Sequence, residues 1–318
     1  MVSQKNDYSL AIWLDLEGIS GVDDPSQVFP ASSEYQICIT KETNAAIKGF
    51  KRGGIDELYV IDGHGYDASP NIRPDLLDRN AQLITKEEMQ KQDRKTLRKE
   101  IGAKVNASVL LGCHARRQAK GFMSHTRIHY PPLRIWINGM EIGEIHLHVL
   151  WASNHNIPTI LFTGDDVAMK EAESLMPDAE HIVTKKSLSR NRCELLPLES
   201  VRQNIEDAAF GVTKRLTEIK PFKLPNNFSI EISFNSREHA FACQNIPNAE
   251  LKDDSIVTYV TRSYDEASSF IDASISIAKY YESHELVSSL IEMDYFEGTI
   301  TKWKKQRCTR LGANWDSD

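Results

Sequence analysis

The chain has 318 residues, of which 41% are hydrophobic, a composition typical of a soluble globular protein with one large domain or two smaller ones. Its formal net charge is −7, so electrostatics give no support to a nucleic-acid partner. No apolar run reaches the ~18 residues that a membrane span needs, and the N-terminal segment lacks the apolar stretch of a signal peptide, so no membrane association is expected.

The beginning of the chain predicts a βαβ unit. Two apolar runs, 8–14 and 57–61, have the length of buried strands. Between them, residues 33–52 have the pattern of a helix with Ser32 or Ser33 as its N-cap. Because two strands joined through a helix pair in parallel, this unit predicts a parallel sheet.

The middle of the chain continues the same alternation of strands and helices. The expected elements are an exposed helix 82–100, strands 107–111 and 158–163, a hairpin 134–143 around Asn138-Gly139, a helical stretch from Glu144, and helices 167–175 and 199–217. After residue 220 the pattern changes to an alternating strand 228–234, a strand 255–261 and helices 264–282 and 284–294.

These elements predict an α/β fold, with a mostly parallel sheet flanked by helices and a smaller C-terminal α+β module. We expect three parts: a metal-binding catalytic α/β domain over 1–222, the α+β module over 223–282, and a helical C-terminal tail over 283–318.

The five cysteines are odd in number, far apart and never in a CxxC pair. They are Cys38, Cys113, Cys193, Cys243 and Cys308. This usage indicates free thiols in a reducing compartment rather than a disulfide framework, and we expect a cytoplasmic protein. Because Cys113 precedes His114, a catalytic thiol is one hypothesis, but a small buried residue at a strand end is the favoured interpretation.

Acidic residues and histidines follow three of the predicted strands. Asp15 and Glu17 follow the first, His64 follows the second and His114 follows strand 107–111. Open α/β sheets bind ligands outside the carboxyl ends of their strands, so one site assembled from distant segments is expected. Glu144, after the hairpin, is a fifth candidate for this site.

Three carboxylates and two imidazoles form a ligand set that suits zinc, manganese or cobalt. Five side chains exceed the three that one catalytic zinc usually needs, and they fit two metal ions that share a water. With a bridging hydroxide such a site is electrically neutral, which lowers the cost of burying it. This chemistry predicts a hydrolase, with His125 as general acid/base or as nucleophile.

Each of these residues also has an ordinary structural explanation. Asp15 and Glu17 suit a solvated loop or a helix cap, and His64 suits a turn. A histidine such as His114 is more often hydrogen-bonded in a core than bound to a metal. Glu144 suits the first turn of a helix, where the helix dipole favours acidic residues.

A series of short motifs, taken together, resembles the zinc-dependent D-aminopeptidase family (DppA-like, of the dipeptide-permease operon type). The motifs are Asp15-Leu16-Glu17-Gly18-Ile19-Ser20-Gly21, Asp62-Gly63-His64, Leu111-Gly112-Cys113-His114-Ala115, Gly121-Phe122-Met123-Ser124-His125-Thr126, Ile137-Asn138-Gly139 with Gly143-Glu144, Gly164-Asp165-Asp166 and Ser187-Leu188-Ser189-Arg190. Their order and spacing fit the family over roughly residues 9–280.

This resemblance implies a two-zinc centre held by the side chains at five positions and a catalytic histidine at position 125. The zinc positions are Asp15, Glu17, His64, His114 and Glu144. It further implies release of N-terminal D-amino acids from short peptides, and a homo-oligomer, a decamer in the family prototype.

Departures from the family pattern concern the substrate. His148, one helical turn after Glu144, is either a substrate contact, a partner that orients another side chain, or a histidine on the helix surface. Arg116 and Arg117 either bind a substrate carboxylate or face solvent. Two other functions therefore stay open at this point: a metal-dependent amidase for a small non-peptide amide, and a non-catalytic metal-binding oligomeric scaffold.

Overall fold

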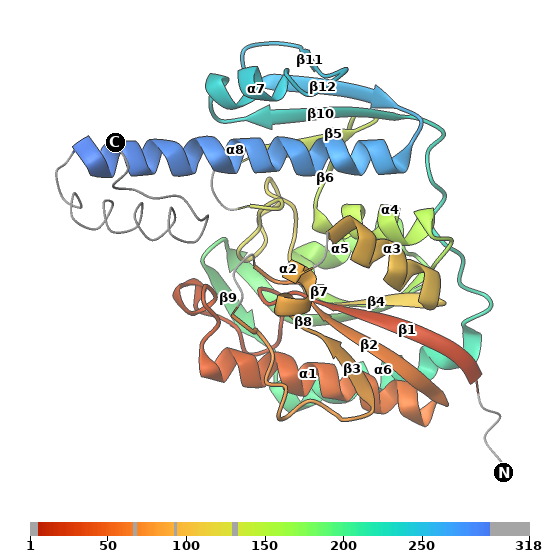
Figure 1. Ribbon diagram of the computed structural model, residues 1–318. Coiled ribbons are helices and arrows are strands. Elements are labelled where there is room, and N and C mark those ends of the chain that lie inside the picture. The colour runs from red at the N-terminus through yellow and green to blue at the C-terminus, as the bar shows by residue number, and fades with distance from the viewer. Residues whose placement is uncertain (1–5, 66–68, 92–93, 129–132, 293–318) are drawn as a thin grey trace, which may run out of the picture.

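A seven-stranded sheet forms the centre of the larger part of the molecule (Figure 1). The computed structural model describes residues 6–65, 69–91, 94–128 and 133–292. The strands lie in the order β3-β2-β1-β4-β7-β8-β9, and all neighbours pair in parallel except β8 and β9. Their bounds are β1 Asn6–Leu14, β2 Ile55–Asp62, β3 Ala81–Ile84, β4 Ala107–Cys113, β7 Thr159–Asp165, β8 Glu180–Ser189 and β9 Arg192–Leu195.

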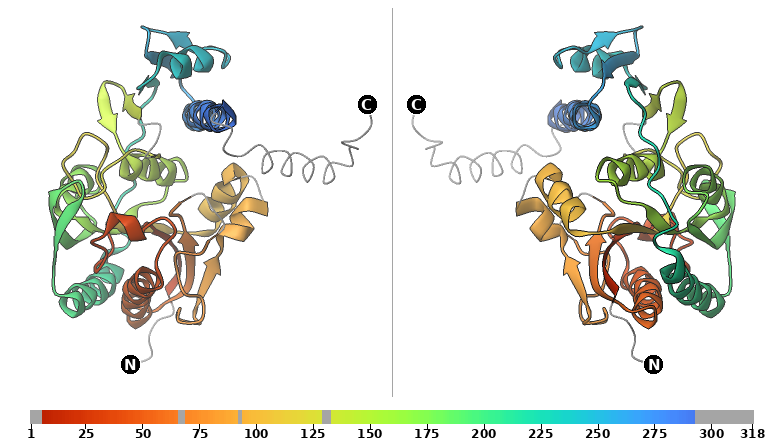
Figure 2. Two further views of the ribbon diagram at one scale, coloured as in Figure 1. Left: turned by 90° about the vertical axis from the view of Figure 1, so that its left-hand side faces the viewer. Right: turned by 90° about the vertical axis from the view of Figure 1, so that its right-hand side faces the viewer.

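Helices cover both faces of this sheet, which explains why its central strands are continuously apolar. All residues of β4 and β7 are buried. Figure 2 shows α1 (Ser33–Arg52) and α6 (Leu198–Val212) on one face. The other face carries α2 Lys86–Lys91, α3 Arg94–Lys104, α4 Glu144–Asn154 and α5 Asp166–Leu175. Short 3₁₀ turns occur at Pro25–Gln27 and Thr213–Arg215.

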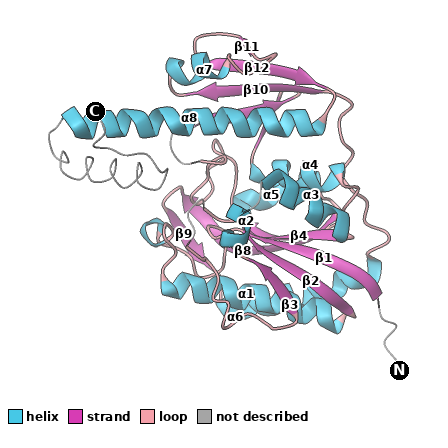
Figure 3. Cartoon of the chain, viewed as in Figure 1, coloured by secondary structure: helices cyan, strands magenta, loops and turns pink. Residues whose placement is uncertain are grey.

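A second, antiparallel sheet lies at the other end of the molecule (Figure 3). Its order is β11-β12-β10-β5-β6, with bounds Glu250–Leu251, Ile256–Thr261, Phe228–Phe234, Leu133–Ile137 and Met140–Ile142. Every second residue of β10 is buried, as its alternating sequence predicts. Helix α7 (Arg237–Cys243) and the long helix α8 (Tyr264–Glu292) pack on this sheet. None of the described helices is long and apolar enough to cross a membrane.

The predicted α/β class is confirmed, and several element boundaries are wrong. Residues 81–84 form the short edge strand β3 instead of beginning a helix, and two helices follow where one was expected. The basic segment 185–192 belongs to the β8–β9 hairpin, which its polar composition concealed. The helices expected at 264–282 and 284–294 are one helix, α8. The expected tail beyond residue 292, with Cys308, lies outside the described residues.

The hairpin β5–β6 bears on the proposed division of the chain at residue 222. Although it comes before that boundary, β5 pairs with β10 in the second sheet. Sequence position alone does not reveal this, because the pairing joins residues about a hundred positions apart in the chain. The second sheet is therefore built from two separate segments, and the division into three parts remains a proposal about independent folding units.

The ends of β1 and β4 approach each other more closely than side chains allow. A Cβ atom at Gly18 would lie 2.1 Å from the carbonyl oxygen of Cys113, and one at Gly112 would lie 2.3 Å from that of Asp15. Gly112 also has a φ of +75°, which favours glycine. The chain continues from β1 to β2 on one side of the sheet and from β4 to β7 on the other, so the boundary between β1 and β4 is the switch point, where α/β folds bind ligands.

The variant Gly18→Ala is expected to lose about 2–4 kcal/mol of unfolding free energy, because backbone must shift to admit the methyl group. Chemical denaturation measures this loss. The matched control is Gly211→Ala in α6, where no atom lies within 4 Å of the added Cβ and alanine favours the helix. Equal stability of the two variants would contradict the close approach of the β1 and β4 ends.

Candidate metal centre

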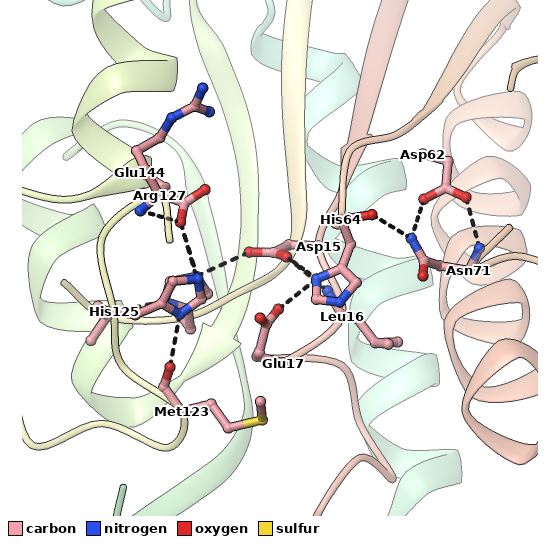
Figure 4. A network of polar contacts seen from close by, with 12 residues as sticks. Asp15, Leu16, Glu17, Asp62, His64, Asn71, Met123, His125, Arg127 and Glu144 are labelled. Carbon is pink, nitrogen blue, oxygen red and sulfur yellow. Dashed lines mark hydrogen bonds and ion pairs between the residues drawn. The ribbon is translucent and has the colours of Figure 1, made fainter. Parts of the chain in front are cut away.

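Six side chains from distant segments gather at the carboxyl edge of the parallel sheet (Figure 4). Asp15 and Glu17 follow β1, His64 follows β2, and His114 follows β4. Glu144 is the first residue of α4, and His125 lies in the loop after β4. The structure therefore brings together all five predicted metal ligands and the predicted catalytic histidine.

One half of the cluster consists of Asp15, Glu17 and His64. The Nδ1 atom of His64 lies 3.0 Å from Oδ1 of Asp15 and 3.0 Å from Oε2 of Glu17. Ligand atoms of the three residues all lie within 4.8 Å of one another, so together they are able to hold one metal ion. Glu17 and His64 are almost fully buried.

The other half is formed by Glu17, His114 and His125, whose ligand atoms also lie within 4.8 Å of one another. Glu17 is common to both halves. The imidazole rings of His114 and His125 stack with centroids 4.0 Å apart and an angle of 15° between their planes. Nε2 of each histidine lies 3.4 Å from Oε1 of Glu144, so the glutamate closes this half of the cluster.

Asp15 connects the two halves through its two carboxylate oxygens. Oδ1 faces His64 at 3.0 Å, whereas Oδ2 lies 3.5 Å from Nε2 of His114. A carboxylate whose two oxygens face two separate sets of nitrogen and oxygen donors has the arrangement of a bridging ligand in a two-metal site.

Backbone carbonyls fix the orientation of two of the histidines. Nδ1 of His114 lies 2.9 Å from the carbonyl oxygen of Ala115, and Nδ1 of His125 lies 2.9 Å from that of Met123. Because a carbonyl accepts only from a protonated Nδ1, Nε2 is the nitrogen of each imidazole that faces the acidic side chains and is left to bind a proton or a metal ion. Metal-binding histidines commonly have such a second hydrogen bond.

The raised pKa values of Asp15 and His64 indicate that the buried cluster needs compensating positive charge. Burial and the neighbouring charge of Glu17 raise the pKa of Asp15 to about 7. Burial opposes the protonation of His64, but the carboxylates of Glu17 and Asp15 outweigh it and raise its pKa to about 10. Without another cation, protons held by Asp15 and His64 thus compensate the buried negative charge, and a divalent ion would supply the same compensation.

The donor atoms fit zinc. They are carboxylate oxygens and imidazole nitrogens, which bind zinc, manganese and cobalt. Burial raises the pKa of the nearby Cys113 thiol well above its usual value, so a reactive thiolate is not favoured there. Cys113 is buried at the end of β4, as the sequence predicts, and the four described cysteines are free.

Buried polar residues that the motifs do not single out hold the ligand loops. Glu42 of α1 accepts hydrogen bonds from the backbone N–H of Ser20 and the hydroxyl of Thr163, at 2.8 Å each. The Thr163 hydroxyl oxygen in turn accepts from the N–H of Gly112 at 2.8 Å. The Glu42 carboxylate thus connects the loop after β1 with the end of β4 through Thr163, and burial raises the pKa of Glu42.

Lys185 of β8 braces the loop that carries Glu17. Its side chain is fully buried, and its ammonium donates to the carbonyl oxygens of Glu17, at 2.6 Å, and of Val22. The ring of Phe122 lies 5.0 Å away. Burial lowers the pKa of Lys185 to about 8. From the sequence, a lysine in a polar strand is expected to be exposed. Its hydrogen bonds to Glu17 and Val22 are therefore apparent only in the folded chain.

Two further contacts hold the histidine segments. Asn71 donates from its side-chain amide to Oδ1 of Asp62, at 2.6 Å, and to the carbonyl oxygen of His64, at 2.8 Å (Figure 4). Arg190 donates to the Ser124 carbonyl oxygen, next to His125, which gives the Ser187–Arg190 motif a structural role.

The three predicted substrate residues lie in different surroundings. Arg116 pairs with Glu171 of α5 at 2.9 Å, so the structure supports a structural ion pair rather than substrate binding. Arg117 lies near two other arginines, Arg190 and Arg134, and burial followed by their charges lowers its pKa. His148 is buried, with Nε2 3.2 Å from the Ser108 hydroxyl, so the interpretation as a helix-surface residue is wrong.

Comparisons with known proteins agree with this geometry. The family model described as D-aminopeptidase matches residues 9–273. The chain is 29% identical over 245 residues to a D-aminopeptidase of Bacillus subtilis (strain 168), a match that covers 75% of this chain and 86% of that protein. A solved structure also matches, that of the Zn-dependent D-aminopeptidase DppA from Bacillus subtilis, described as a self-compartmentalizing protease. The match has a TM-score of 0.74 at 24% sequence identity and covers 85% of this chain and 98% of that one. The two proteins therefore share a fold. Because the family model spans most of the sequence, the chain belongs to the D-aminopeptidase family of peptidases.

Proposed function

We propose that this peptidase is a two-zinc aminopeptidase that releases N-terminal D-amino acids from short peptides. The observation that carries the proposal is the position of Asp15 and Glu17 between His64 on one side and the stacked pair His114 and His125 on the other. The Bacillus subtilis relatives named as D-aminopeptidases, one of them Zn-dependent, support the choice of metal and of substrate.

In this proposal Asp15, Glu17 and His64 hold one zinc ion, and Asp15, His114 and Glu144 complete the second position. Bound zinc would lower the pKa of a water molecule toward neutrality and polarise the scissile carbonyl group. The side chains contribute an acidic site in which Glu17 and His64 are buried. Exclusion of water strengthens electrostatic interactions within the site.

His125 is proposed to transfer protons. Its Nδ1 proton is held by the Met123 carbonyl oxygen, so Nε2 is the atom that exchanges a proton with the substrate or acts as nucleophile. Glu144 lies 3.4 Å from this Nε2 and also accepts the backbone N–H of Arg127 at 2.9 Å. The carboxylate thereby orients the imidazole and stabilises its protonated form.

Assembly and compartment are further parts of the proposal. The description of DppA as self-compartmentalizing supports a homo-oligomer, with a decamer as the specific expectation. The free thiols Cys38, Cys113, Cys193 and Cys243 support a reducing compartment such as the cytoplasm. The amidase and the non-catalytic scaffold considered from the sequence are not favoured by the family match.

The direct experiment compares D-Ala-D-Ala with L-Ala-L-Ala on zinc-loaded protein, on chelator-treated protein and on the variant His125→Ala. Zinc-loaded protein is expected to release alanine from the D-dipeptide and lose this activity on chelation. His125→Ala is expected to lose about 10²–10⁴-fold in turnover through loss of proton transfer while its zinc content stays at the wild-type value.

The matched control is His284→Ala, which removes an exposed histidine of α8. A His125→Ala protein that binds less zinc would make His125 a ligand with Glu17 and His114, contrary to its proposed role. Preference for the L-dipeptide would contradict the proposed substrate.

Lys185→Met tests whether the backbone brace at Glu17 sets zinc affinity. Methionine retains much of the volume but cannot donate to the carbonyl oxygens of Glu17 and Val22, so zinc affinity is expected to fall by about 10–100-fold, as for other residues that support metal ligands. Competition with a chromophoric chelator measures the affinity. Lys186→Met, a change at the exposed neighbouring position, is the control; equal affinities of the two variants would rule out the brace.

A further inference from the structure

A cavity of about 530 Å³ adjoins the metal centre. At one end it is lined by Asp15 and Glu144, two of the proposed zinc ligands. From there it extends between α3, α4 and α8, and α8 supplies Ser269 and Asp272 on its outer side. The cavity therefore continues directly from the place where a scissile amide would lie. Its volume is in the range of pockets that bind drug-sized molecules and is larger than a methyl side chain needs.

Aromatic rings form one wall of this cavity. Trp13 of β1 contacts Trp151 of α4 edge-on, with ring centroids 5.0 Å apart, and contacts His148 at 5.5 Å. His148 and Trp151 lie 5.1 Å apart, so the three rings form a continuous surface. Burial, followed by the charge of Arg98, lowers the pKa of His148 well below its usual value. The imidazole is thus uncharged at neutral pH, and the wall is apolar.

The charged groups of the cavity argue against a cationic ligand. The guanidinium of Arg98 lies over both indoles, 5.2 Å from the ring of Trp13 and 5.7 Å from that of Trp151. It already occupies the positions where a ligand cation would stack. Two acidic residues of α8 line the cavity, Asp265 and Asp272, and Asp272 pairs with Arg127 at 3.0 Å. Lys95 and Lys99 of α3 also line the cavity, so its charged groups are of both signs, and an uncharged aromatic ring suits the aromatic wall.

We propose that this cavity receives a large aromatic substituent of the substrate, next to the amide bond that is cleaved. The inference rests on the proposed aminopeptidase function and adds a substrate class to it: short peptides with an aromatic D-residue at one of the two positions that flank the bond. Trp13, His148 and Trp151 are the specificity-determining residues. His148 thereby takes a substrate-contacting role without reaching the metal ligands.

Two serines of α8 provide a matched pair for the test. Ser269 lines the cavity, whereas Ser276 is not among its lining residues. Both are exposed, and both donate to the carbonyl oxygen four residues earlier, at 2.7 Å and 2.8 Å. Ser269→Trp places an indole at the outer end of the cavity, and Ser276→Trp makes the same change elsewhere on the helix.

The substrates are D-Ala-D-Ala, D-Phe-D-Ala and D-Ala-D-Phe. For the wild type, kcat/KM of the better phenyl dipeptide is expected to exceed that of D-Ala-D-Ala by about tenfold or more, because the ring leaves water for an apolar wall. Ser269→Trp is expected to remove this preference, whereas Ser276→Trp retains it. A wild-type preference for D-Ala-D-Ala, or an unchanged preference in Ser269→Trp, would overturn the inference.

A binding measurement separates failure of this inference from failure of the proposed function. If no dipeptide is hydrolysed, the aminopeptidase proposal has failed, and calorimetric titration with D-phenylalaninamide and D-alaninamide still tests the cavity. Tighter binding of the phenyl compound by the wild type and by Ser276→Trp, and its loss in Ser269→Trp, would support an aromatic site. Equal binding of both compounds by the wild type would refute it.

Discussion

The mutual repulsion of buried carboxylates at one edge of a parallel sheet is the interaction on which the rest of this structure depends. Asp15 and Glu17 lie close enough for Glu17 to raise the pKa of Asp15, and both face the same imidazole of His64. Such a cluster is stable only with compensating positive charge, either from retained protons or from bound cations. A divalent metal centre supplies that charge, and the resulting electrophilic site suits amide hydrolysis.

The fold holds these charges together by using the point where the chain order of the sheet reverses. The loop after β1 and the end of β4 approach each other there so closely that Gly18 and Gly112 have no room for a side chain. Buried groups behind the site, the Glu42 carboxylate and the Lys185 ammonium, tie the ligand loops to α1 and β8. The hairpin β5–β6 of the second sheet leads directly into α4, whose first residue is Glu144, so the position of this glutamate depends on the second sheet.

Sequence patterns predicted the parts of the structure that follow from local chemistry. Strand ends followed by Asp15, Glu17, His64 and His114 identified the cluster, since carboxyl ends of parallel strands meet at one edge. Other features depend on contacts between distant segments: the edge strand β3 has only four residues, and the hairpin β5–β6 joins the second sheet through a partner about a hundred residues away. The sequence around Lys185 predicts an exposed side chain, because the carbonyl oxygens that it contacts belong to residues far away in the chain. The aromatic cavity likewise combines residues of β1, α3, α4 and α8.

We expect that two cations share the carboxylate of Asp15, whose two oxygens face the two halves of the cluster. Crystals of zinc-loaded protein, measured at the zinc absorption edge, test it most directly through anomalous scattering. Two peaks about 3.5–4 Å apart are expected, one beside Asp15, Glu17 and His64 and the other beside His114 and Glu144. A single peak, or zinc bound away from Asp15, would contradict it.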